Sequence, residues 1–129
     1  MLKIIFVDDE LDLLPLVKLC LSSELEDYPN TIYTASSGEG CLKLLGELAQ
    51  NQPLLVITDI NMPHMNGFEL IEKIKTQFPM VKYCVCTAYD TPEYEKKAKD
   101  VGAMQFFSKP LEFRKLASTI TNQFPVTTA

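Results

Sequence analysis

Basic side chains are scarce in this chain of 129 residues, which has 12 Lys and Arg against 17 Asp and Glu. Nucleic acids and anionic membrane surfaces select clustered Lys and Arg, whereas this chain has a formal net charge of −5 and no arginine-rich patch. The composition therefore disfavours direct binding to nucleic acid or to a membrane. A secretory signal needs a longer apolar stretch than the first one here, which ends at two aspartates after five residues. We therefore expect a cytoplasmic protein.

Cysteine and histidine are few, and their spacing does not suggest a zinc site or a disulfide. The chain has four cysteines without CxxC spacing and one histidine, His64, in an expected loop. Cys84 and Cys86 fall on one face of an expected strand at about 6 to 7 Å, too far apart for a disulfide. We expect the cysteines to be buried thiols of the core.

Short runs rich in Ile, Val and Leu alternate along the chain with segments of helical spacing. The expected strands are residues 3–7, 31–35, 54–58, 81–86 and 104–108. Continuous apolar runs are typical of strands buried on both faces, and such strands form parallel sheets covered by helices. The length and a hydrophobic content of 47% suit a single core. The sequence thus predicts one α/β domain over residues 1–129, with helices on both faces of a doubly wound sheet.

Capping signals mark two of the expected helices. Ser36 and Glu39 have the spacing of a capping box before the second helix. The fourth helix is expected to begin at Thr91 and Pro92 and to end at Gly102, and its thin apolar stripe includes Tyr94. This helix is therefore expected to bury the least apolar surface.

Polar side chains follow four of the expected strands. Asp8 and Asp9 follow the first strand, Asp59 the third, Thr87 the fourth and Lys109 the fifth. The carboxyl ends of parallel strands lie along one edge of the sheet, where open sheets bind ligands. A single strand-end aspartate often caps the next helix. The combination of all five residues instead predicts a ligand site.

The chemistry of these residues favours a cation and a phosphoryl group. Three adjacent carboxylates repel one another, so they either hold protons or recruit cations. Mg²⁺, or Mn²⁺ in its place, accepts one or two carboxylates and completes its shell with water and phosphate oxygens. With Lys109 also neutralising charge, one carboxylate can act as a nucleophile towards phosphorus and form an acyl phosphate. Thr87 can then donate a hydrogen bond to a phosphoryl oxygen.

Several motifs in this order and spacing resemble the receiver domain of two-component response regulators, and the resemblance covers essentially the whole chain. The matching segments are Val7-Asp8-Asp9-Glu10, Asp59-Ile60-Asn61-Met62-Pro63-His64-Met65-Asn66-Gly67, Thr87-Ala88-Tyr89, Val101-Gly102-Ala103 and Lys109-Pro110. The resemblance implies a flavodoxin-like fold of five parallel strands in the order 2-1-3-4-5 with five helices. It also implies a cis peptide bond between Lys109 and Pro110.

The resemblance assigns roles to the site residues. It implies that Asp59 accepts a phosphoryl group from a histidine kinase or a histidine phosphotransfer protein. It further implies that Asp9 and Asp59 bind Mg²⁺ directly with the Asn61 carbonyl, and that Asp8 assists through water. By the same resemblance, Thr87 and Lys109 bind the phosphoryl oxygens.

The family also implies a conformational switch and a point of water attack. Thr87 is expected to move towards the phosphoryl group while Phe106, on the fifth strand, turns inward. The responding surface comprises the fourth helix, fifth strand and fifth helix. Because Phe106 has no hydroxyl, where many relatives have tyrosine, it can signal only by the packing of its ring. Asn61 and Tyr89 are expected to lie over the attacking water, and the Tyr89 ring should slow the loss of phosphate.

The first helix offers a candidate docking surface. Leu16 and Leu19 are expected to face outward, and the family uses this helix to meet the phosphorylated histidine of its donor. The alternative is that both leucines pack against a neighbouring helix. Pro15 is expected to bend the same helix by removing one backbone donor. The downstream partner, or a covalently linked output domain, is not identified by the sequence.

Three functional classes are consistent with these residues. We expect a signalling domain that catalyses only its own phosphotransfer and autodephosphorylation, and is not an enzyme acting on external substrates. An aspartate-nucleophile phosphatase also uses Mg²⁺, but it would require a further Asp where this chain has Asn61. A scaffold that binds partners without phosphate would not need the complete set of acids, Thr87 and Lys109.

Overall fold

The computed structural model describes residues 1–48 and 52–126 and alternates strands with helices along them. The elements are β1 (Leu2–Val7), α1 (Leu13–Glu24), β2 (Asn30–Ala35), α2 (Gly38–Leu48), β3 (Leu54–Asp59), α3 (Gly67–Gln77), β4 (Lys82–Thr87), α4 (Pro92–Asp100), β5 (Phe106–Ser108) and α5 (Phe113–Gln123). The five strands pair in parallel in the order β2-β1-β3-β4-β5. This order confirms the predicted doubly wound sheet.

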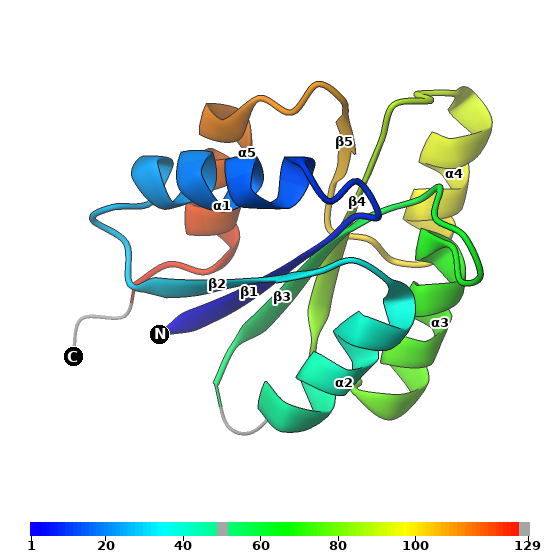
Figure 1. The fold of residues 1–129 in the computed structure, drawn as a ribbon, viewed down its shortest axis with the longest axis horizontal. Coiled ribbons are helices and arrows are strands. Elements are labelled where there is room, and N and C mark those ends of the chain that lie inside the picture. Colours follow the sequence, from blue (N-terminus) through cyan, green and yellow to red (C-terminus); the bar gives the residue numbers. More distant parts are fainter. Residues whose placement is uncertain (49–51, 127–129) are drawn as a thin grey trace.

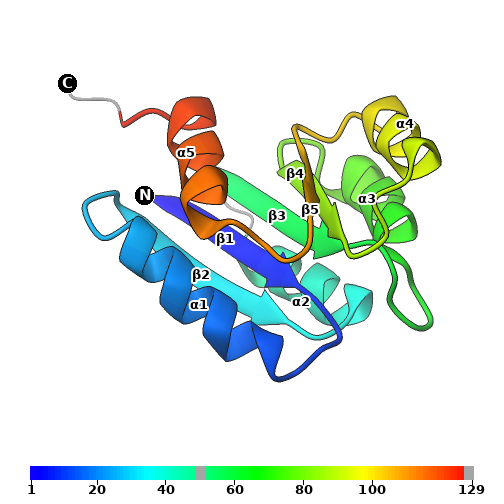
Figure 2. The ribbon, with the colours of Figure 1, turned by 90° about the horizontal axis from the view of Figure 1, so that it is seen from above.

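The helices cover both faces of the sheet. Figures 1 and 2 show α1 and α5 on one face and α2, α3 and α4 on the other. Alternate strand residues supply the two cores, so that Phe6 packs with α1 and α5 whereas its neighbour Val7 packs with α2 and α3. Every residue of the central strand β3 is buried. Burial on both faces explains why the strand sequences are continuously apolar.

Helix α4 has fewer buried residues than the other helices. It begins as predicted, because the Thr91 side chain accepts a hydrogen bond from the Tyr94 N–H and Pro92 occupies the first helical position. Gly102, with φ of 84°, follows its end in a conformation that favours glycine. Ala98 is its one fully buried residue.

Within the described ranges, no helix is long and apolar enough to cross a membrane.

Three local predictions were wrong. Helix α2 begins one residue later than expected, so Ser37, not Ser36 with Glu39, caps it by accepting a hydrogen bond from the Gly40 N–H at 3.0 Å. Pro15 lies in the first turn of α1, where the backbone N–H groups have no intrahelical partner, so the cause expected for a bend is absent. Strand β5 is shorter than the predicted 104–108.

Candidate functional site

Three carboxylates meet at the carboxyl edge of the sheet. Asp8 and Asp9 directly follow β1, and Asp59 is the last residue of β3. One carboxylate oxygen from each lies within 4.8 Å of the others. Asp8 and Asp59 are buried, whereas Asp9 is exposed. The parallel pairing of β1 with β3 thus brings together acids that are about fifty positions apart in the chain.

Lys109 supplies the positive charge of this cluster. Its Nζ lies 2.6 Å from Asp8 Oδ2, 3.5 Å from Asp59 Oδ2 and 3.9 Å from Glu10 Oε1. Its backbone N–H donates to the Thr87 carbonyl at 2.8 Å, which places Lys109 beside the end of β4. The peptide bond from Lys109 to Pro110 is cis, as the resemblance implies. In this arrangement the ammonium bonds Asp8 most closely and also faces Asp59.

Asp59 is in an environment that disfavours its negative charge. Burial raises the pKa of Asp59 to about 6, against the opposing effect of the Lys109 ammonium. The nearby Asp8 carboxylate raises this pKa further, whereas the backbone N–H groups of Ile60 and Asn61 lower it. A bound cation at this edge would stabilise the ionised form of Asp59, and oxygen-only donors of this kind suit a hard divalent ion.

Thr87 is buried at the end of β4 and accepts two hydrogen bonds. Its Oγ1 accepts from the Tyr89 backbone N–H at 3.0 Å and from Asn61 Nδ2 at 3.3 Å. The Asn61 Oδ1 in turn accepts from the Tyr94 hydroxyl at 3.1 Å. Tyr94 was not predicted as a site residue, because the sequence places it only in the apolar stripe of α4.

Gly67 allows the chain to turn tightly behind Asp59. Its N–H donates to the Ile60 carbonyl at 2.8 Å, and a Cβ at this position would lie 2.3 Å from the Asp59 carbonyl oxygen. Helix α3 begins here with a capping box, in which Asn66 and Glu69 bond each other's backbone N–H. The absence of a side chain at Gly67 therefore brings the start of α3 against the end of β3.

The two aromatic residues assigned to switching and water access lie at different depths. Phe106 is half-buried and packs against the cluster of α3, α4 and β4 side chains that includes Val85 and Ala98. Tyr89 is 64% exposed. Its backbone contacts Thr87, but its ring points largely into solvent.

The predicted outward face of α1 is present in the structure. Leu16 is 49% exposed and Leu19 is 70% exposed, while Leu14, Val17 and Leu21 are the buried residues of the helix. The alternative in which Leu16 and Leu19 pack against a neighbouring helix is wrong.

Three of the four cysteines are buried and Cys20 is half-buried, and all four are free thiols, as expected.

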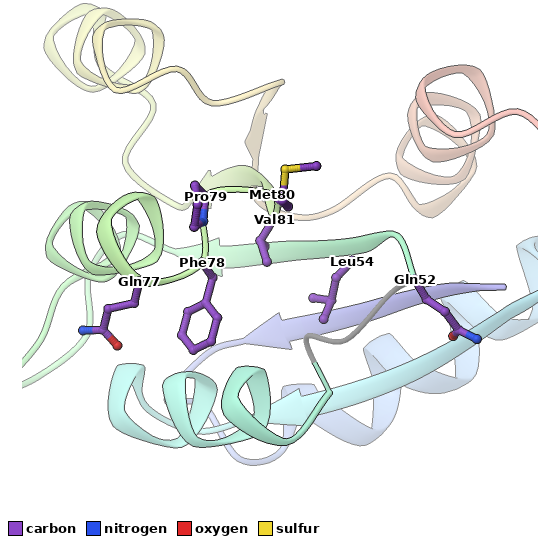
Figure 3. A pocket seen from close by; sticks show the side chains of 7 residues that line it. All are labelled: Gln52, Leu54, Gln77, Phe78, Pro79, Met80 and Val81. Atoms are coloured by element: carbon purple, nitrogen blue, oxygen red, sulfur yellow. The ribbon is translucent and has the colours of Figure 1, made fainter.

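A separate hollow lies at the opposite, amino-terminal edge of the sheet, where β3 and β4 begin (Figure 3). It is lined by Gln52, Leu54, Gln77, Phe78, Pro79, Met80 and Val81. Among the described residues, those that line it have no ionisable side chain. It therefore lacks the chemistry found at the acidic edge.

The fold and the acidic edge together define a class of α/β domain that binds its ligand beside the carboxyl ends of parallel strands. Within that class, the family model of the response regulator receiver domain matches residues 4–121. The chain belongs to this family, the signalling domains of two-component systems. Receiver domains are phosphorylated by histidine kinases or phosphotransfer proteins, and they generally bind Mg²⁺ at an acidic pocket.

Known relatives support this family assignment. An uncharacterized response regulatory protein of Staphylococcus epidermidis is 35% identical over 117 residues, which are 90% of this chain and 44% of the relative. Sporulation initiation phosphotransferase F of Bacillus subtilis is 23% identical over 96% of this chain and 94% of its own. A receiver domain from Clostridium thermocellum superposes with a TM-score of 0.82 at 28% identity, covering 95% of this chain and 93% of that one. This chain spans only 20% to 44% of the length of four curated relatives, one of which is the Staphylococcus epidermidis protein above.

Proposed function

We propose that Asp59 is the phosphoacceptor of this receiver domain and takes its phosphoryl group from a phosphorylated histidine. In this step an Asp59 carboxylate oxygen forms a bond to phosphorus while the bond from phosphorus to the imidazole nitrogen breaks. The bonding electrons stay on the imidazole, which takes up a proton, and an acyl phosphate results. The observation that supports this proposal is the position of Asp59, buried beside two further aspartates and 3.5 Å from the Lys109 ammonium.

The donor set fits Mg²⁺, with Mn²⁺ as a substitute. We propose that Asp9, Asp59 and the Asn61 backbone carbonyl bind the ion directly, and that Asp8 assists through water. These are hard oxygen donors, and two carboxylates with one carbonyl leave positions for water and for a phosphoryl oxygen. When bound, the ion would neutralise charge on the carboxylates and on the transferred group.

Lys109 and Thr87 are proposed to bind the transferred group. Phosphorylation replaces a carboxylate by a group carrying a charge of about −1.5 to −2. Lys109 already faces Asp59, so its ammonium needs only a small movement away from Asp8 to reach a phosphoryl oxygen. Thr87 would donate its hydroxyl proton to another oxygen of the group.

The proposed response is a movement of α4, β5 and α5. As Thr87 moves towards the phosphoryl group, Phe106 would turn inward to fill the vacated space. Helix α4 buries little, because Ala98 is its one fully buried residue, so shifting it disrupts few core contacts. Asn61 and Tyr89 would limit the access of the water that removes the phosphoryl group.

The proposed partners lie on separate surfaces. The histidine donor would dock on α1, where Leu16 and Leu19 are exposed. The changed surface of α4, β5 and α5 would bind a downstream partner or a covalently linked output domain. On this proposal residues 1–129 form one cytoplasmic receiver domain that catalyses only its own phosphotransfer and autodephosphorylation.

Intact-protein mass spectrometry tests the central step. After incubation with acetyl phosphate and Mg²⁺, the protein should gain the mass of one phosphoryl group, and Asp59→Asn should gain none. A gain that persists in Asp59→Asn, or that does not depend on a divalent ion, would contradict the proposal. Continued hydrolysis of external phosphate esters at many turnovers per chain would instead indicate a phosphatase.

A further inference from the structure

A chain of hydrogen bonds connects α4 to the candidate site. The Tyr94 hydroxyl donates to Asn61 Oδ1 at 3.1 Å, and Asn61 Nδ2 donates to Thr87 Oγ1 at 3.3 Å. The amide of Asn61 is thus bonded at both ends, once to the helix and once to the buried hydroxyl. No other side chain of α4 forms a hydrogen bond with a site residue in the described part of the chain.

The Thr87 hydroxyl has little acceptor capacity left in this arrangement. A hydroxyl has two acceptor lone pairs and one proton. Both lone pairs are used here, because Oγ1 accepts from the Tyr89 backbone N–H and from Asn61 Nδ2. The Asn61 bond is already long at 3.3 Å, so a movement of Thr87 towards Asp59 would break it.

The ring of Tyr94 is held in place from two sides. It packs against Phe68 of α3, with ring centroids 6.0 Å apart and an interplanar angle of 58°. The Tyr94 backbone N–H donates to the Thr91 side chain that caps α4. The Lys97 ammonium lies 4.8 Å from the centroid of the Phe68 ring and so adds a second contact between the two helices. The Tyr94 hydroxyl is therefore directed at Asn61 by packing that does not depend on Asn61.

Because residue 106 is phenylalanine, the hydrogen bonds from Tyr94 through Asn61 to Thr87 matter more for the proposed switch. Phe106 has no hydroxyl, so it cannot form a hydrogen bond that distinguishes the two positions of its ring. The Tyr94 hydroxyl is a polar group on α4 that is bonded to the site before phosphorylation. Its bond partner, Asn61, donates to Thr87 Oγ1 and so opposes a movement of Thr87 towards Asp59, while the Thr87 proton stays available for a phosphoryl oxygen.

We propose that Tyr94 is a positioning residue, whose hydroxyl orients the Asn61 amide onto Thr87 and thereby stabilises the unphosphorylated arrangement. This inference rests on the proposed function, because it assumes that Thr87 leaves Asn61 when a phosphoryl group occupies the site. Formation of the phosphorylated arrangement would release Asn61 from Thr87 and weaken the contact between Asn61 and α4. The start of α4 would then be free to shift.

The test compares Tyr94→Phe with the wild-type protein, using beryllium fluoride with Mg²⁺ as a stable mimic of the phosphoryl group. Phenylalanine keeps the ring contact with Phe68 and removes only the hydroxyl. Loss of one partly exposed hydrogen bond from the unoccupied state should tighten beryllium fluoride binding by about 2- to 5-fold. Unchanged or weaker binding by Tyr94→Phe would overturn the inference.

Tyr83→Phe is the matched control. The Tyr83 hydroxyl donates to the Val101 carbonyl at 2.7 Å, directly after the other end of α4, so this variant loosens the same helix without touching Asn61. It should bind beryllium fluoride as the wild type does. Equal tightening by both variants would mean that any loosening of α4 suffices, and would overturn the role of Tyr94.

Asn61→Ala separates positioning from general stability. In an Asn61→Ala background, adding Tyr94→Phe should change beryllium fluoride affinity no further, because the hydroxyl has lost its partner. A similar tightening in both backgrounds would overturn the inference.

If the wild type itself does not bind beryllium fluoride with Mg²⁺, the proposed function fails. The role of Tyr94 can then still be tested by NMR of the metal-free protein. The signals of the Asn61 side-chain NH₂ group should shift in Tyr94→Phe and not in Tyr83→Phe, and the absence of a shift in Tyr94→Phe would overturn the inference.

Discussion

Replacing Asp59 by Asn should stabilise the metal-free protein at neutral pH. Burial raises the pKa of Asp59 from 3.8 to about 6, so between these values the folded protein binds more protons than the unfolded chain. Stability contributed by the protonated carboxyl is present below pH 4 and is lost as the pH rises through 6. By linkage, this difference in pKa lowers the free energy of unfolding of the wild type by about 3 kcal/mol at pH 7. The gain in the variant should be smaller, because Lys109 loses its interaction with the Asp59 carboxylate.

We therefore expect Asp59→Asn to increase the free energy of unfolding by about 1 to 3 kcal/mol at pH 7 in the presence of a chelator. Asparagine keeps the shape of the side chain and removes the charge. Below pH 4 the two proteins should be nearly equally stable, since the wild-type carboxyl is then protonated in both states. Urea unfolding curves at pH 4, 5, 6 and 7, extrapolated linearly to water, measure the difference.

The exposed Asp27, near the opposite edge of the sheet, provides the control. Asp27→Asn should change the free energy of unfolding by less than about 0.5 kcal/mol at every pH. Added Mg²⁺ should stabilise the wild type and not Asp59→Asn, which narrows or reverses the gap at pH 7. A gap that is the same at pH 4 and pH 7, or a variant less stable than the wild type at pH 7 without metal, would refute the reasoning.

Three further variants, one of them with a matched glycine control, test other parts of the structure. Tyr89→Glu should lose its phosphoryl group faster than the wild type in a dephosphorylation assay, because the ring no longer restricts water; an equal or slower rate would contradict this role. Leu16→Asp should slow phosphotransfer from a phosphohistidine protein while leaving labelling by acetyl phosphate unchanged, and the docking hypothesis fails if transfer from the protein donor is unaffected. Gly67→Ala should destabilise the fold by about 2 kcal/mol or more in urea, because its Cβ would lie 2.3 Å from the Asp59 carbonyl oxygen. Gly46→Ala, with no atom within 4 Å of the new Cβ, should instead be neutral or stabilising by up to about 1 kcal/mol.

The fold was predictable because burial on both faces leaves a direct mark in the sequence. The continuous apolar runs identify the strands, and the polar residue that follows each run lies at the carboxyl edge by the geometry of parallel sheets. Asp8, Asp59 and Lys109 therefore come together as expected. The strand order, in contrast, came from the resemblance to receiver domains, since apolar runs do not specify which strands are neighbours.

The details that the sequence did not predict depend on positions set by packing. Ser36 and Ser37 are both suitable caps, and only the start of α2 decides that Ser37 is used. The bond between Tyr94 and Asn61 joins residues 33 positions apart and requires the placement of α4 against the loop after β3. Periodicity locates Tyr94 on a helix face, but it does not give the direction of its hydroxyl.

The complete burial of β3 has a mechanical consequence for the proposed signal. This strand pairs with β1 and β4 and packs against helices on both faces, so moving it would disrupt more core contacts than moving α4. A new charge on Asp59, at the end of this strand, would therefore not be accommodated by a movement of the strand itself. If Asp59 is phosphorylated as proposed, the deformation would instead pass to the loops of the carboxyl edge and to α4, which has one buried residue.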